Sequence, residues 1–217
     1  MFTGDLTSPT LRVLVIDDHS IFREGLKQII SETSDIRVLG EASNGRDGLS
    51  FVADGEWDVV VMDLSMPEGS GLETLAQIRS VRPGLPVLIL SMYPEEQFAL
   101  RALRAGAAGY LCKDAAPDDL LAAIRKVASG GTFVTPCTAE RLAARLSEGG
   151  QPHEALSDRE FQVLRLLASG KTVSEIAHTL ALSVKTISTY RTRLLDKMNL
   201  KTNAELTRYA LENNLVD

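Results

Sequence analysis

Polar residues with reactive side chains stand directly after short apolar runs in the N-terminal part of the sequence. Asp17 and Asp18 follow "RVLVI", Asp63 follows "VVVM", Ser91 follows "PVLIL" and Lys113 follows "GYLC". Each alone has a structural explanation, because Asp and Ser begin turns and Lys is usually solvated. Their recurrence at the same kind of position indicates one site built from several strands.

These residue types favour phosphoryl chemistry. Three carboxylates close together repel one another unless a cation lies among them, and oxygen ligands with room for water suit Mg²⁺. A carboxylate beside such an ion can attack phosphorus, and Asp63 is the expected nucleophile. Lys113 and Ser91 are expected to bind the phosphoryl oxygens. The expected metal ligands are the carboxylates of Asp17, Asp18 and Asp63 and the backbone carbonyl of Ser65.

The apolar spacing also predicts the elements that position these residues. Strands are predicted at 12–16, 36–42, 58–62, 86–90 and 109–112, and helices at 19–32, 45–55, 71–82, 95–105 and 117–129. Continuous apolar strands that alternate with amphipathic helices are typical of an α/β fold, here a doubly wound five-stranded parallel sheet covered on both faces. Function in such sheets gathers at the carboxyl ends of the strands.

Length and composition favour two domains. The chain has 217 residues, of which 44% are hydrophobic, and no apolar run is long enough to span a membrane. We therefore expect a cytoplasmic protein without a membrane partner. Its two cysteines, Cys112 and Cys137, lack metal-ligand spacing and are expected to be reduced thiols.

The charge is divided unevenly along the chain. Residues 1–130 hold 12 Lys and Arg against 19 Asp and Glu, a balance of -7, whereas residues 156–217 hold 9 against 7, a balance of +2. Residues 131–155 contain Gly, Pro and polar stretches that predict a linker. The expected domains are thus 11–130 and 156–217. The second contains four predicted helices, at 157–168, 172–180, 183–198 and 202–214.

The helix at 183–198 has two distinct sides. Its apolar side consists of Val184, Ile187, Tyr190, Leu194, Leu195 and Met198. The opposite side carries Lys185, Ser188, Thr189, Thr192 and Arg193. Short hydroxyl side chains edged by cations suit the major groove and its phosphates, so 172–198 predicts a helix-turn-helix whose second helix binds DNA. Arg191 lies among the apolar residues, and we expect it to reach Glu160, Glu175 or a DNA phosphate.

The N-terminal motifs resemble a known family. "LVIDDH", "VVVMDLSMPEGSGLE", "LILS" and "GAAGYLCKD" are similar, in this order, to the CheY-like receiver domain of bacterial two-component response regulators. The resemblance implies that Asp63 accepts a phosphoryl group from a sensor histidine kinase. It also implies that Tyr110 turns inward when Ser91 moves to the phosphate. One departure is Asp114, where many receivers have proline.

The C-terminal motif resembles a second family. "LSDREFQVLRLLASGKTVSEIAHTLALSVKTISTYRTRLLDKM" is similar to the LuxR-type helix-turn-helix domain of NarL/FixJ regulators, an all-α domain of four helices. The resemblance implies that Ser188, Thr189 and Thr192 read bases, at positions where some members carry lysines. It also favours a dimer surface on the last helix.

Together these features predict a phosphorylation-controlled transcription regulator with a sensor histidine kinase, double-stranded DNA and RNA polymerase as partners. Phosphorylation should change the face built from residues 95–129, releasing the C-terminal domain or promoting a homodimer. A phosphatase would need a second carboxylate where Ser65 stands, so we expect no enzyme activity beyond slow autodephosphorylation. Two alternatives stay open: C-terminal helices that bind protein instead of DNA, and an acidic site with a structural role only.

Overall fold

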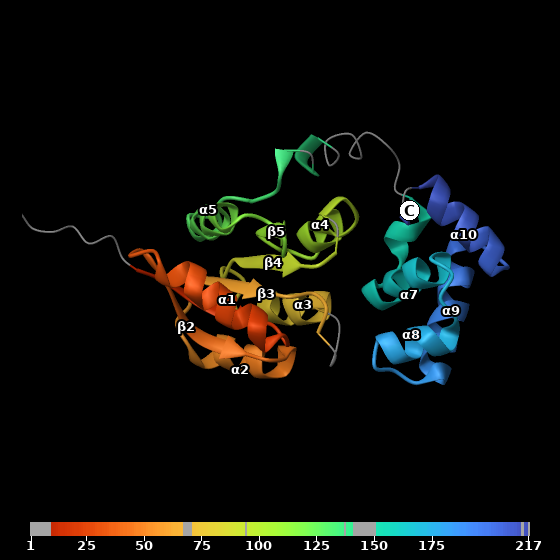
Figure 1. Ribbon diagram of the computed structural model, residues 1–217, viewed down its shortest axis with the longest axis horizontal. Coiled ribbons are helices and arrows are strands. Elements are labelled where there is room, and N and C mark those ends of the chain that lie inside the picture. The colour runs from red at the N-terminus through yellow and green to blue at the C-terminus, as the bar shows by residue number, and fades with distance from the viewer. Residues whose placement is uncertain are drawn as a thin grey trace, which may run out of the picture. The chain divides into compact units, whose positions relative to one another are not determined.

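The computed structural model describes residues 10–66, 71–93, 95–136, 138–140, 151–213 and 215–216. The chain forms two compact units, Met1–Ala143 and Ala144–Asp217, whose elements are labelled in Figure 1. Within the described ranges, no helix is both long and apolar enough to cross a membrane. Cys112 is a free, half-buried thiol, whereas Cys137 lies outside the described residues.

The first unit contains the predicted five-stranded parallel sheet. Its strands are β1 (Leu11–Ile16), β2 (Ile36–Ala42), β3 (Val59–Met62), β4 (Val87–Ser91) and β5 (Gly109–Cys112), in the order β2-β1-β3-β4-β5. Every neighbouring pair is parallel. The strands are apolar on both faces because both faces are covered, as in other doubly wound sheets.

Helices cover both faces of this sheet (Figure 1). They are α1 (Ser20–Ser31), α2 (Gly45–Asp54), α3 (Gly71–Val81), α4 (Glu95–Arg104) and α5 (Pro117–Ala128). On one face, Val13 and Val15 of β1 pack with buried side chains of α1 and α5. Ile16 points to the other face of the sheet. There α2 packs so closely that a Cβ on Gly48 would lie 2.5 Å from Ile16 Cδ1. Each strand therefore ends between two helical layers.

The segment that follows α5 is hydrogen-bonded to the first unit, although the sequence predicts a linker from residue 131 onward. Phe133 forms a parallel bridge with Gly109; its amide donates to Ala108 O at 3.0 Å, and its carbonyl accepts from the Tyr110 amide at 3.0 Å. The amide of Thr135 donates to Glu95 Oε1 at 2.9 Å. We call residues 131–136 the strap, because they connect the edge of β5 to the start of α4.

The described residues of the second unit form the four predicted helices and a short 3₁₀ turn, η1 (Pro152–Ala155), that the sequence pattern did not indicate. The helices are α7 (Asp158–Ala168), α8 (Val173–Thr179), α9 (Val184–Met198) and α10 (Asn203–Glu212). Capping boxes at Ser157 and Thr172 begin α7 and α8. Their interior is apolar, with Phe161, Ile176, Ile187, Leu194 and Leu206 all at most 1% exposed.

Candidate functional site

Strand register brings the predicted acidic residues together. Ile16 pairs with Met62 across β1 and β3, so Asp17 and Asp63 leave the sheet side by side, and the Asp63 amide donates to Ile16 O at 2.9 Å. Both residues are 2% exposed. Asp18 is less buried, with its side chain 25% exposed. Gly71 keeps the loop after Asp63 compact, because a Cβ there would lie 2.5 Å from Leu64 Cα.

Lys113 reaches this group from the end of β5. Its Nζ lies 2.6 Å from Asp17 Oδ2 and 2.8 Å from Asp63 Oδ2, and its side chain is 3% exposed. Burial raises the pKa of Asp63, and the neighbouring Lys113 opposes this rise. One lysine balances only one of three carboxylates, so the group keeps an excess of negative charge that favours a bound cation.

The donor atoms fit a hard divalent ion. Oδ1 of Asp18 is buried without a hydrogen-bond partner, although the ring Nδ1 of His19 lies 3.0 Å from it. Ser65 donates its amide to Asp63 Oδ1 at 3.1 Å. Oxygen atoms of this type, with an incompletely bonded carboxylate among them, are what Mg²⁺ requires.

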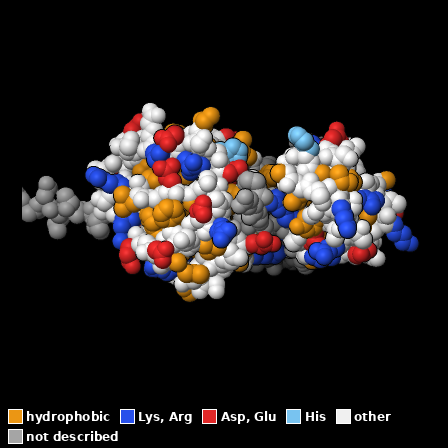
Figure 2. All heavy atoms as spheres, turned by 90° about the horizontal axis from the view of Figure 1, so that it is seen from below, with side chains coloured by type: hydrophobic (Ala, Val, Ile, Leu, Met, Phe, Trp, Pro, Cys, Tyr) orange, Lys and Arg blue, Asp and Glu red, His pale blue; other side chains and the backbone are white. Residues whose placement is uncertain are grey.

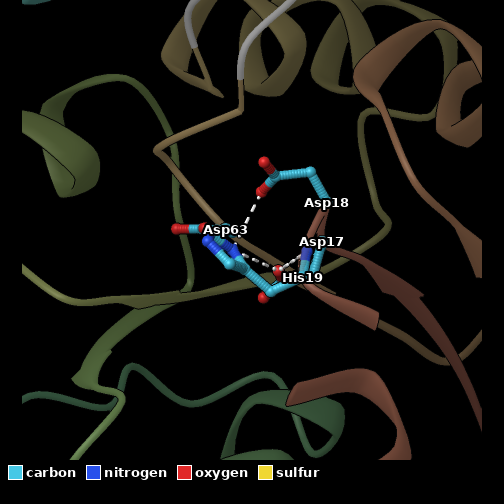
Figure 3. A group of neighbouring side chains, drawn as sticks. All are labelled: Asp17, Asp18, His19 and Asp63. Atoms are coloured by element: carbon cyan, nitrogen blue, oxygen red, sulfur yellow. Dashed lines mark hydrogen bonds and ion pairs between the residues drawn. The ribbon is translucent and has the colours of Figure 1, made fainter. Parts of the chain in front are cut away.

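Sequence reasoning missed His19, which lies within this site. One ligand atom from each of Asp17, Asp18, His19 and Asp63 falls within 4.8 Å of the others. Figure 3 shows the imidazole directed at the carboxylates. The available signal was its position directly after two aspartates, at the N-cap of α1.

Ser91 and Tyr110 form a second group beside the acidic one. Among the described residues, the Ser91 hydroxyl interacts with the Tyr93 amide, which donates to it at 3.3 Å, and with the Tyr110 hydroxyl. Tyr110 is fully buried and donates its hydroxyl to Tyr93 O at 2.8 Å. Burial raises the pKa of Tyr110, so it stays a neutral donor. The inward turn of Tyr110 that the family resemblance implies on phosphorylation stays a prediction.

The second candidate site is the solvent side of α9. Its predicted DNA-facing residues are exposed: Lys185, Ser188, Thr189, Thr192 and Arg193. Lys185, Thr189 and Arg193 also border a hollow of about 260 Å³. Within the part of the chain that the structure describes, neither Lys185 nor Arg193 has an ion-pair partner. Lys and Arg side chains are visible on the C-terminal unit in Figure 2.

Two details of α9 differ from the sequence prediction. Arg191 reaches neither Glu160 nor Glu175, and its Nε donates to Asn203 Oδ1 at 2.7 Å; its contact with a DNA phosphate stays a prediction. Glu160 is instead bonded by Lys197 at 2.7 Å, and Glu175 completes the cap of α8. Val184, expected on the apolar side, is 51% exposed because it lies in the first turn of α9.

A parallel α/β domain with a buried acidic edge, followed by a helix-turn-helix, is the domain arrangement of a two-domain DNA-binding regulator. The family model described as response regulator receiver domain matches residues 13–125. The model described as bacterial regulatory proteins, luxR family, matches residues 154–210.

Individual proteins agree with both matches. Response regulator UvrY of Escherichia coli (strain K12) is 36% identical over 208 residues, which cover 94% of this chain and 95% of that protein. A structure of the Salmonella typhimurium RcsB response regulator has 30% identity and a TM-score of 0.59, and covers 93% of this chain and 98% of that one. RcsB from Salmonella enterica serovar Typhimurium bound to a promoter with the phosphomimetic BeF₃⁻ has 28% identity, a TM-score of 0.59, and coverage of 92% and 97%.

The chain belongs to the two-component response regulators of the NarL/FixJ type, which join a receiver domain to a LuxR-type DNA-binding domain. It is a DNA-binding transcription regulator of a two-component system.

Proposed function

We propose that Asp63 is the phosphoacceptor and that a sensor histidine kinase is the donor. The observation that carries the proposal is the buried Asp63 carboxylate with Lys113 Nζ 2.8 Å from its Oδ2. In the transfer, the bond between phosphorus and the kinase histidine nitrogen breaks and a bond from phosphorus to an Asp63 oxygen forms. Lys113 and Ser91 then hold phosphoryl oxygens.

Mg²⁺ is the proposed cofactor, held by oxygen atoms of Asp17, Asp18, Asp63 and the Ser65 carbonyl. When bound, the ion would neutralise charge that develops on the phosphoryl oxygens. The buried Asp18 oxygen that lacks a hydrogen-bond partner and the excess negative charge support this assignment. We propose no enzyme function beyond slow autodephosphorylation, because Ser65 stands where an aspartyl-phosphate phosphatase has a general acid.

An apolar hollow beside the acidic site is the proposed contact for the kinase. It measures about 440 Å³, and its lining includes Ile21, Phe22, Met92 and Lys113. Ile21 is 88% exposed and Met92 is 69% exposed. Large apolar side chains exposed around a hollow favour a protein contact. A kinase seated there would bring its histidine close to Asp63.

The strap suggests how phosphorylation is transmitted. Tyr110 contributes its ring to the Ser91 group and its backbone amide to Phe133 of the strap. A shift of Ser91 toward a phosphoryl group would move Tyr110 and therefore strain the strap, which Thr135 also ties to α4. We propose that this changes the surface of α4, β5 and α5, and that it frees the C-terminal domain or promotes a homodimer.

The proposed output is sequence-specific binding of double-stranded DNA by α9, as a dimer with two half-sites. Exposed Lys185 and Arg193 support it, and so does the related RcsB, whose structure includes a promoter. We keep residues 11–130 and 156–217 as the two domains, with 131–155 between them. RNA polymerase is a further proposed partner, and binding to the chromosome implies a cytoplasmic location.

The proposal is tested by measuring intact mass after the full chain is incubated with Mg²⁺ and acetyl phosphate. We expect one phosphoryl adduct on the wild type and on the control Asp54→Asn, whose carboxylate is exposed on α2, and none on Asp63→Asn. Duplex binding on the same samples should tighten only where the adduct forms. An adduct that persists in Asp63→Asn would refute the assignment.

A further inference from the structure

We propose that His19 is a direct ligand of the metal at the acidic site, and that its imidazole shifts the site's preference from Mg²⁺ toward Mn²⁺ and Co²⁺. The inference rests on the proposed metal site and adds a residue and a metal selectivity to it. Its basis is a nitrogen atom held among three carboxylates (Figure 3).

The distances agree with one shared coordination sphere. His19 Nδ1 lies 3.0 Å from Asp18 Oδ1, 3.3 Å from Asp17 Oδ1 and 4.0 Å from Asp63 Oδ2. One ring nitrogen therefore lies within 4.0 Å of an oxygen of each carboxylate, so an ion bound among these oxygens would be within reach of His19 as well.

Local structure holds His19 in this place. Its backbone amide donates to Asp17 Oδ1 at 2.8 Å, which fixes the residue beside the first carboxylate. The side chain is 60% exposed, although Nδ1 is turned inward. Nδ1 is therefore the ring nitrogen that faces the carboxylates, and imidazole binds metals through a ring nitrogen.

Lys113 and His19 approach the same carboxylates. At Asp17 they use different oxygens, Oδ2 for Lys113 and Oδ1 for His19. At Asp63 both face Oδ2, with Lys113 Nζ 2.8 Å and His19 Nδ1 4.0 Å from it.

Ligand chemistry determines the expected selectivity. Mg²⁺ prefers oxygen and loses its waters reluctantly. An imidazole ligand adds to the affinity for Mn²⁺ and more for Co²⁺, in line with the order for divalent first-row metals. A site of three carboxylates and one imidazole should therefore bind Co²⁺ and Mn²⁺ more tightly, relative to Mg²⁺, than the carboxylates alone.

The test uses Mn²⁺ alone as the probe on the full chain. Pulsed electron paramagnetic resonance detects nitrogen bonded to Mn²⁺, and ¹⁵N labelling of histidine shifts that signal. We expect the signal in the wild type and in the control His178→Asn, which alters an exposed histidine of α8, and its loss in His19→Asn. In titration calorimetry, the preference for Co²⁺ over Mg²⁺ should fall about tenfold or more in His19→Asn.

The other outcomes separate this inference from the proposed function. Mn²⁺ that binds in an Asp17-dependent manner without a histidine nitrogen signal would overturn the role of His19 and leave the metal site intact. A rise in Mg²⁺ affinity in His19→Asn without a nitrogen signal would show that His19 competes with the metal, which also overturns the inference. If neither Mn²⁺ nor Mg²⁺ binds to the wild type, both the inference and the proposed metal site are wrong.

Discussion

The salt dependence of DNA binding should reveal which cations of α9 contact phosphates. The helix carries four: Lys185, Arg191, Arg193 and Lys197. Lys197 is paired with Glu160, and Arg191 donates its Nε to Asn203, so we test the exposed Lys185 and Arg193 first. Each neutralised phosphate contributes about -0.9 to the slope of log K against log salt concentration.

The magnitude follows for Arg193→Gln. A dimer with two α9 helices loses two phosphate contacts, so the slope should become shallower by about 1.8. An increase in salt from about 50 to about 200 mM is a fourfold change, and 4 raised to the power of about 1.8 is about 12. Over this range, the fold loss in the variant's affinity should therefore be about 12 times smaller than the wild type's.

Fluorescence anisotropy with a labelled random duplex at several KCl concentrations measures this slope. The control is Arg46→Gln, which removes the same charge from an exposed position on α2 and should leave the slope unchanged. Weaker binding by Arg193→Gln at an unchanged slope would refute the phosphate contact and indicate a structural role. Absence of wild-type binding even at low salt would favour protein-binding C-terminal helices instead.

Four further predictions concern Glu160, Asp63, Mg²⁺ binding and the strap. Burial raises the pKa of Glu160, but the hydrogen bonds from Lys197 and Ser157 outweigh burial and hold this pKa below its usual value of 4.5. The ionised Glu160 therefore stabilises the fold above pH 4.5, and this contribution is lost as the pH falls. Glu160→Gln should cost about 1–3 kcal/mol at pH 7 in chemical unfolding, and equal stability at pH 7 would contradict this. Burial raises the pKa of Asp63, so ionisation of this carboxyl group destabilises the metal-free fold as the pH rises. Without metal, the Asp63→Asn variant should therefore have a higher melting temperature than the wild type at pH 7. This difference should vanish in acid, where Asp63 is protonated. Mg²⁺ at about 100 times its Kd should stabilise the wild type by about 2.7 kcal/mol and the variant by less, and equal shifts would argue against the site. Gly109→Ala places a Cβ 2.8 Å from Phe133 O and should speed proteolysis of the strap, whereas an unchanged cleavage rate would show that the strap tolerates the methyl group.

The sequence was sufficient to predict the sheet because its strands are short, continuous apolar runs between amphipathic helices. Observed strand bounds such as Val87–Ser91 lie within a residue of the predicted ones. The clustering of Asp17, Asp63 and Lys113 also followed, since parallel strands end at a common edge. These features depend on local pattern and topology alone.

Other features depend on tertiary packing that no local pattern encodes. The strap has only one bridged residue, Phe133, and its Gly, Pro and Thr content is also typical of a linker. The partner of Arg191 depends on where α10 begins relative to α9, and Asn203 at that start is the residue within reach. The sequence supplied the neighbours of His19 but no information on the direction of its ring.

The hydroxyl groups on α9 constrain the bases that it can read. Ser188, Thr189 and Thr192 donate their hydroxyl protons to carbonyls one turn earlier, at 2.9, 3.0 and 3.1 Å. Their oxygens are therefore presented to the groove as acceptors, beside the two threonine methyl groups. Acceptors match the amino groups of adenine and cytosine, and methyl groups match thymine, whereas the guanine edge offers acceptors that need a donor such as Lys185 or Arg193. The centre of α9 should thus favour adenine, cytosine and thymine, with guanine contacts at positions that cations such as Lys185 or Arg193 reach.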